Sequence, residues 1–177
     1  MELFGLQKPL LEITSLVFFT NFLHNTWKRE FPYAWLFLLL TITSVFFHSK
    51  IFIETNPIPL IFDYSIQDII SFLDKVVLYS IIIYGGYLFW KTREGLQSAT
   101  SSIPIVTFLS VCYLYIVGYF LNKYCFDPDI NIANLSHGAV HILSSIGHHM
   151  ITYEYSKLNT IRSILLHGLL YRHGIDK

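Results

Sequence analysis

Apolar residues in this chain gather in long runs and do not alternate with polar residues over short distances. Strong runs cover residues 33–53, 69–90 and 103–121. Each is close to the ~20 residues that an α-helix needs to cross the hydrocarbon core of a bilayer. Two weaker runs, 10–23 and 135–155, contain more polar residues. The pattern therefore predicts about five transmembrane helices joined by short connections.

The last of these runs, residues 135–155, is unusually polar for a membrane helix. Its polar side chains are Ser136, His137, His141, Ser144, Ser145, His148 and His149. A helix of this kind is costly to surround with lipid, so we expect it inside the bundle, with its histidines facing one another or a wet cavity. The following segment, residues 158–171, is too short to cross and ends in basic residues, which favours an amphipathic helix at the membrane interface.

The composition agrees with a membrane protein that has a single domain over residues 1–177. Hydrophobic residues make up 53% of the chain and charged residues only 14%, whereas a soluble domain carries about a quarter charged residues. Lys plus Arg equals Asp plus Glu at 12 each, so the chain has no basic field to attract a nucleic acid. We expect an all-α integral membrane bundle.

Loop charges predict its orientation. One side of the membrane receives eight basic residues and the other receives three. Cytoplasmic loops are enriched in Lys and Arg, so the N-terminus is expected to be luminal or extracellular and the C-terminus cytoplasmic. The eight are Lys28, Arg29, Lys91, Arg93, Lys157, Arg162, Arg172 and Lys177, and the three are Lys8, Lys50 and Lys123.

Five polar residues inside the predicted spans have a spacing that favours a metal site. Ser44 and His48 are four residues apart, as are His137 and His141, and residues four apart share one face of a helix. Asp74 lies near the start of the third span. The alternating directions of the spans bring all five residues to a similar depth on one side of the membrane.

Three histidines with water in the fourth position form an open catalytic zinc site. His48, His137 and His141 are the candidate ligands, Asp74 is the candidate carboxylate for holding water and moving its proton, and Ser44 is the candidate hydroxyl for stabilising an oxyanion. His148 lies two turns beyond His141, about 10 Å along the helix axis. We expect His148 in a buried polar pair or relay, not on the same ion.

The order Ser44-x-x-x-His48, Leu73-Asp74, His137-x-x-x-His141 resembles the CREST superfamily of membrane hydrolases. Its alkaline ceramidase branch is the most similar. The resemblance implies zinc on the three histidines, Asp74 and Ser44 beside zinc-bound water, and attack of that water on a lipid amide such as ceramide, a sphingolipid. Members of the superfamily have seven transmembrane helices, so the five predicted here would be a reduced version.

Other functions remain open from the sequence. His137-x-x-x-His141 followed by His148-His149 resembles the histidine boxes of di-iron lipid hydroxylases and desaturases, which need about eight ligands. A haem-binding electron carrier with two histidine ligands is another candidate. A receptor or scaffold that keeps a structural metal is a third. The expected partners are the bilayer and a lipid substrate, and a homo-oligomer is open because five helices enclose a thin chamber.

Three minor expectations concern residues outside this set. His24 lies near a loop and is expected to be solvated. Gly85 and Gly86 are expected to permit close helix contact. Thirteen helical residues would separate Cys112 from Cys125 by about 20 Å, which is too far for a disulfide.

Overall fold

The computed structural model describes residues 8–49, 66–93 and 102–172. Throughout these ranges the chain is helical apart from short turns, and no strand occurs in them. The α-helices are α1 (Lys8–Ser15), α2 (Val17–Trp27), α3 (Phe31–Ser49), α5 (Ile66–Arg93), α6 (Ser102–Cys112), α7 (Gly118–Leu121) and α8 (Ile130–Arg172). A π-helical stretch, η3 (Tyr113–Val117), joins α6 to α7, and a single 3-10 turn, η4 (Tyr124–Phe126), follows. The expected all-α bundle is confirmed.

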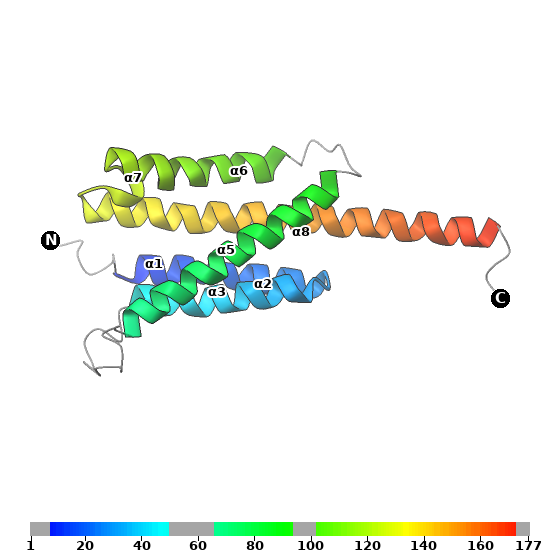
Figure 1. The fold of residues 1–177 in the computed structure, drawn as a ribbon, viewed down its shortest axis with the longest axis horizontal. Coiled ribbons are helices and arrows are strands. Elements are labelled where there is room, and N and C mark those ends of the chain that lie inside the picture. The colour runs from blue at the N-terminus through cyan, green and yellow to red at the C-terminus, as the bar shows by residue number, and fades with distance from the viewer. Residues whose placement is uncertain (1–7, 50–65, 94–101, 173–177) are drawn as a thin grey trace.

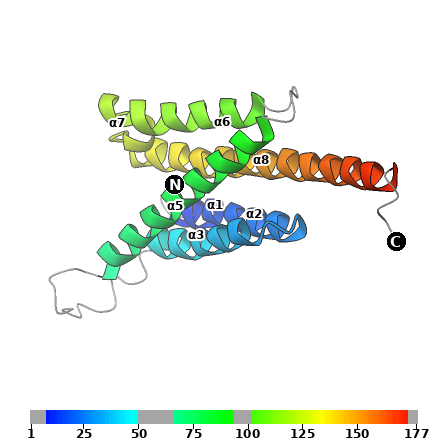
Figure 2. The same ribbon diagram turned by 45° about the vertical axis from the view of Figure 1, so that its right-hand side comes forward.

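Helix α8 is the central element of the bundle. Figure 1 shows α6 and α7 along one side of α8, and α1, α2 and α3 along the other. Helix α5 crosses the bundle diagonally, from the C-terminal end of α3 toward the start of α6, and Figure 2 shows the same crossing from a second direction. Helices α1, α2, α5 and α6 all pack on α8, so among the described elements this polar helix has the most neighbours.

Three helical segments in the described part of the chain are long and apolar enough to cross a membrane. They are α3, α5 and the continuous segment Ser102–Leu121. The outer faces of these segments carry large apolar side chains, among them Trp35, Ile83 and Phe120 with 61%, 74% and 76% of their surface exposed. Such faces suit lipid and not water. The chain is a membrane protein.

The predicted first span is divided in two. Helices α1 and α2 meet at Leu16, where the Thr14 and Ser15 hydroxyls both donate to the Leu11 carbonyl oxygen, at 3.2 and 2.7 Å. Hydroxyl groups that bond back to the preceding turn compete with the backbone and bend helices. Neither half is long enough to span a membrane alone, so the prediction that residues 10–23 cross the bilayer stays a prediction.

Helix α8 is much longer than the predicted fifth span. The Asp129 carboxylate accepts a hydrogen bond from the Asn131 backbone N–H at 2.9 Å and so caps its first turn. Its 43 residues extend about 64 Å, roughly twice the hydrocarbon thickness of a bilayer. The segment 158–171 continues α8 without a break and extends past the other helices (Figure 1). Its location at the membrane interface stays a prediction.

The apolar core lies where α2, α3, α5 and α8 meet. Its buried members are Phe18, Tyr33, Phe37, Leu40, Ile81, Leu88 and Ile151. Gly85 lies against this core, because a Cβ atom there would collide with the Tyr33 hydroxyl and would lie 3.1 Å from the His148 ring. A Cβ atom on Gly86 would meet nothing within 4 Å. The expected close contact therefore holds for Gly85 and is wrong for Gly86.

Candidate metal centre

Three histidines from two helices meet at the end of the bundle where α3 ends and α8 begins. One ring-nitrogen atom of each of His48, His137 and His141 lies within 4.8 Å of the other two. His48 is in the last turn of α3, and His137 lies about two turns into α8. The four-residue spacing on α8 turns both of its imidazoles toward α3, with ring centroids 5.1 and 5.3 Å from His48.

The donor set and its geometry fit a zinc ion. Imidazole nitrogens bind zinc at about 2.0–2.1 Å in a tetrahedral arrangement, which places neighbouring ligand atoms about 3.4 Å apart. The ring nitrogens of the three histidines are separated by up to 4.8 Å. Small rotations of the side chains would shorten these separations to that value. Thr14 Oγ1 lies 3.1 Å from His141 Nδ1, so Nε2 is the His141 nitrogen that could bind a metal ion. Orienting partners of this kind are typical of metal-binding histidines.

Asp74 lies on α5 and faces α3. The Thr43 hydroxyl donates a hydrogen bond of 2.8 Å to Asp74 Oδ1. Thr43 is five residues before His48, which is about 7.5 Å along the helix axis. The Asp74 carboxylate therefore lies on the neighbouring helix, more than one turn of α3 away from His48, and it is not part of the group of donor atoms that converge.

Ser44 is held by a partner that the sequence did not indicate. It is 2% exposed, and its Oγ lies 2.9 Å from Ser15 Oγ. The Ser15 hydroxyl donates its only hydrogen to the Leu11 carbonyl oxygen, so Ser44 is the donor in the pair. To stabilise an oxyanion, Ser44 would have to exchange this bond for one to the substrate. Its catalytic role stays a prediction.

Sequence reasoning missed Tyr115, a second hydroxyl at this end of the bundle. Its ring lies edge-on to His137, with centroids 6.4 Å apart and planes at 89°. Tyr115 belongs to the π-helical stretch η3. A π-helical turn rotates the side chains that follow it to a different face of the helix, and such turns are frequent at functional sites. Because a π-helical turn leaves no clear trace in the hydrophobic pattern, that pattern did not reveal Tyr115.

The histidines further along α8 have other partners. His148 Nδ1 shares a hydrogen bond with the Tyr33 hydroxyl, so the expected buried polar pair is present. His149 Nδ1 lies 3.1 Å from the Ser145 carbonyl oxygen, and its ring lies 4.7 Å from that of His24. His24 is only partly exposed and its Nε2 atom is buried. The expectation that His24 is solvated was wrong, because α8 covers it.

Neither cysteine extends the donor set. Cys112 and Cys125 are both free, in agreement with the absence of a predicted disulfide. Burial raises the pKa of the Cys125 thiol to about 11, so the thiol is protonated at neutral pH. Neither thiol belongs to the group of donor atoms that converge.

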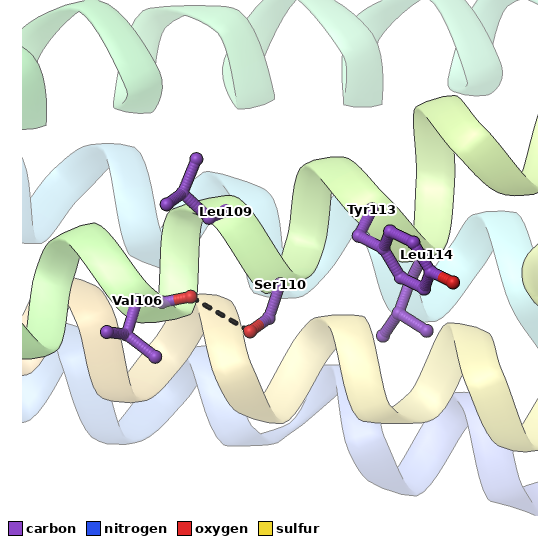
Figure 3. Close-up of a pocket in the computed structure, with 5 residues that line it drawn as sticks. All are labelled: Val106, Leu109, Ser110, Tyr113 and Leu114. Atoms are coloured by element: carbon purple, nitrogen blue, oxygen red, sulfur yellow. Dashed lines mark hydrogen bonds between the residues drawn. The ribbon is translucent and has the colours of Figure 1, made fainter.

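A shallow surface pocket of about 470 Å³ lies along α6 and η3. Its lining residues are Val106, Leu109, Ser110, Tyr113 and Leu114, and they are shown in Figure 3. The Ser110 hydroxyl donates to the Val106 carbonyl oxygen at 2.9 Å. The lining residues include no carboxylate and no imidazole, and the Ser110 hydroxyl already has a hydrogen-bond partner. The pocket therefore has the character of a lipid-facing surface.

Comparisons with models of known protein families, with curated proteins and with solved structures found no match to this chain.

Proposed function

We propose that this protein is a zinc-dependent intramembrane hydrolase that cleaves a lipid amide of the ceramide type. The observation that carries the proposal is the meeting of His48, His137 and His141, whose donor atoms lie within 4.8 Å of one another. His48 precedes His137, the nearer of the two α8 histidines, by 89 positions along the chain. The four-residue spacings within α3 and within α8 do not by themselves make the histidine-bearing faces of the two helices meet. Their meeting is therefore independent support for a shared site.

In this proposal His48, His137 and His141 hold the metal, and Thr14 orients His141. When bound, zinc supplies Lewis acidity and lowers the pKa of a water molecule to about 7, which makes a nucleophile available at neutral pH. Asp74 receives the proton of that water and delivers it to the leaving nitrogen. The Thr43 hydroxyl, which donates to Asp74 Oδ1, holds the carboxylate in place for this transfer.

Two hydroxyl groups are candidates for stabilising the negative charge on the amide oxygen. Ser44 donates to Ser15 in the present arrangement, whereas Tyr115 is 46% exposed. A hydroxyl that does not first have to break another hydrogen bond can donate to a developing oxyanion at a lower free-energy cost. We therefore add Tyr115 to Ser44 as a candidate for this role.

The proposal also places the chain in the bilayer with five spans. Helices α3, α5 and Ser102–Leu121 would cross as lipid-facing elements, and the α1–α2 pair and the first half of α8 would cross inside their cover. The loop charges would place the N-terminus and the metal centre on the luminal or extracellular side. The lipid substrate would enter from the bilayer.

The di-iron alternative is less well supported. Such enzymes need about eight ligands, and the metal-binding group in the described part of the chain contains three. His148 and His149, which would complete the histidine boxes, bond to Tyr33 and to the Ser145 carbonyl. A non-catalytic protein with a structural metal remains the main rival.

Metal analysis and lipid hydrolysis on the same preparation test the proposal. We expect about one zinc per chain in the purified, detergent-solubilised protein, and release of fatty acid from a ceramide. The Asp74→Asn variant should keep zinc and lose a factor of about 10²–10⁴ in kcat. Asp68→Asn, an exposed position on the same helix, is the matched control and should keep full activity.

The outcomes separate the rival functions. Two irons per chain would favour the hydroxylase, and zinc with no hydrolysis in any lipid amide would favour the scaffold. Absence of any bound metal in the wild-type protein would overturn the proposal.

A further inference from the structure

Polar side chains continue along α8 well beyond the histidine cluster, and three of them meet side-chain partners on α1 or α2. This arrangement, the polar ladder, has three side-chain hydrogen bonds as rungs. They join Thr14 to His141 (3.1 Å), Asn21 to Ser145 (2.6 Å) and Asn25 to Thr152 (2.7 Å).

The polar ladder is long enough to matter for transport across the bundle. From its first rung at His141 to its last at Thr152 it covers 11 residues of α8, or about 16 Å, compared with about 30 Å for the hydrocarbon core of a bilayer. Its second and third rungs are covered by protein, since Asn21, Asn25 and Thr152 are 0% exposed. A continuous row of polar groups therefore leads from the metal centre toward the opposite end of the bundle.

Two atoms in the middle of the polar ladder have no partner among the described residues. Asn21 uses its Nδ2 to donate to Ser145 Oγ, but its Oδ1 is buried and accepts no hydrogen bond. One turn further along α2, His24 Nε2 is also buried and unbonded. A buried polar atom without a partner costs about 1–3 kcal/mol, so both atoms call for a small polar ligand.

His149 supplies a third group at the same place. Its ring lies 4.7 Å from that of His24, and it follows Ser145 by one turn of α8. Because His149 Nδ1 donates to the Ser145 carbonyl oxygen at 3.1 Å, the Nε2 atom of the neutral ring is an acceptor. Asn21 Oδ1 and His149 Nε2 are therefore two acceptors on residues near His24: Asn21 precedes it by about one turn of α2, and the His149 ring lies 4.7 Å from the His24 ring.

This set of groups matches one water molecule. Water donates two hydrogen bonds and accepts others, and buried waters in proteins make about three. A single water can donate to Asn21 Oδ1 and His149 Nε2 and accept from His24 Nε2–H. We propose that Asn21, His24 and His149 form an internal water-binding site between α2 and α8, and that the polar ladder leads water from this site to the histidine cluster.

The second half of this inference rests on the proposed function. Hydrolysis of an amide breaks the C–N bond and consumes one water, whose oxygen joins the acyl carbon and whose hydrogens leave with the acid and the amine. A metal centre enclosed by apolar helices needs a supply of that water. The polar ladder provides a route that does not pass through the lipid.

Radiolytic hydroxyl labelling of the full chain in lipid nanodiscs tests the water site. Internal water generates radicals in place, so we expect rapid oxidation of His24 and His149, and little oxidation of Phe18, which is buried in the neighbouring apolar core. Asn21→Leu should reduce labelling of His149 severalfold. Thr20→Leu, an exposed position one residue away, is the matched control and should leave labelling as in the wild type.

A second variant covers the case in which Asn21→Leu does not fold. His24→Phe keeps a ring against α8 and removes the donor, so it should lower His149 labelling in the same way. Unchanged labelling of His149 in either folded variant would overturn the water site.

Kinetics then test the supply of water separately. Asn21→Leu should lower kcat severalfold, with KM and zinc content unchanged, and Thr20→Leu should have no effect. An unchanged kcat in Asn21→Leu would overturn the route while the labelling result stands on its own. If the wild-type protein hydrolyses no lipid amide, the proposed function fails, and the labelling experiment still decides the water site.

Discussion

The first turns of α8 and its middle turns use histidine in different ways. At the start, His137 and His141 face a third imidazole, His48 of α3, and their donor atoms converge. In the middle, His148 and His149 face a phenol and a backbone carbonyl, and each ring makes a hydrogen bond to one partner. The histidines of α8 thus differ in role according to their partners. Those that face a third imidazole are candidate metal ligands, and those that face a phenol or a backbone carbonyl hold helices together.

The largest difference between the two regions is expected in metal binding. His141→Ala removes a donor atom from the cluster and should abolish stoichiometric zinc, since two remaining imidazoles do not complete a site. His148→Ala should retain about one zinc per chain. Elemental analysis of both variants beside the wild type measures this directly.

The opposite pattern would reverse the assignment of the two regions. Zinc lost in His148→Ala and kept in His141→Ala would mean that the packing histidine is the ligand. His167→Ala, an exposed position near the end of α8, controls for loss of metal through nonspecific histidine binding.

A smaller effect is expected when the polar pair in the middle of α8 is broken. Tyr33→Phe removes the hydroxyl that bonds His148 Nδ1 and leaves a buried nitrogen unpaired. Hydrogen bonds between membrane helices contribute about 0.6 kcal/mol on average and up to about 1.7. We expect destabilisation in this range by reversible SDS-induced unfolding in mixed micelles, with zinc content unchanged.

Tyr119→Phe provides the matched control for that measurement. Tyr119 is 62% exposed, so loss of its hydroxyl should leave the unfolding midpoint where it is. Equal stability of Tyr33→Phe and the wild type would show that the pair in the middle of α8 contributes nothing to the fold.

The last comparison concerns two adjacent glycines on α5. Gly85→Ala places a methyl group against the Tyr33 hydroxyl and the His148 ring, and overpacking of this kind costs about 1–3 kcal/mol, less where the tyrosine shifts. Gly86→Ala points into open space and should be neutral or stabilising by up to about 1 kcal/mol. The difference between the two variants in the same unfolding assay is the quantity to compare, and equal midpoints would contradict the packing described.

Much of the fold followed from local pattern. The apolar runs predicted helices within a few residues of α3, α5 and Ser102–Leu121, because helix formation in a bilayer depends mainly on the length of an apolar segment. The polar character of residues 135–155 predicted a central helix, and α8 lies there (Figure 1). The unbroken continuation of α8 through residues 158–171 was not predicted, because span length and the basic residues at the end of the segment favoured a separate helix. These residues carry no strong helix-breaking signal, which agrees with the continuous helix.

For the candidate metal centre, local pattern predicted which histidines share a helix face and the depth at which they lie. Four-residue spacing determines that His137 and His141 share a face, and alternation of spans determines that His48 lies at their depth. These are properties of single helices and of their order along the chain. The sequence by itself therefore determined the helices, their apolar surfaces and the level at which the three histidines lie.

Only the tertiary structure decided which side chains meet. Thr43, not its neighbour Ser44, bonds Asp74, and Ser44 bonds Ser15. His148 pairs with Tyr33, and Asn21 with Ser145. Each pairing depends on the rotation of a helix about its own axis relative to a helix distant in sequence. That rotation is set by the packing of all the faces at once, with the bend at Leu16 and the π-helical stretch at Tyr115 changing it locally, and no single segment encodes it.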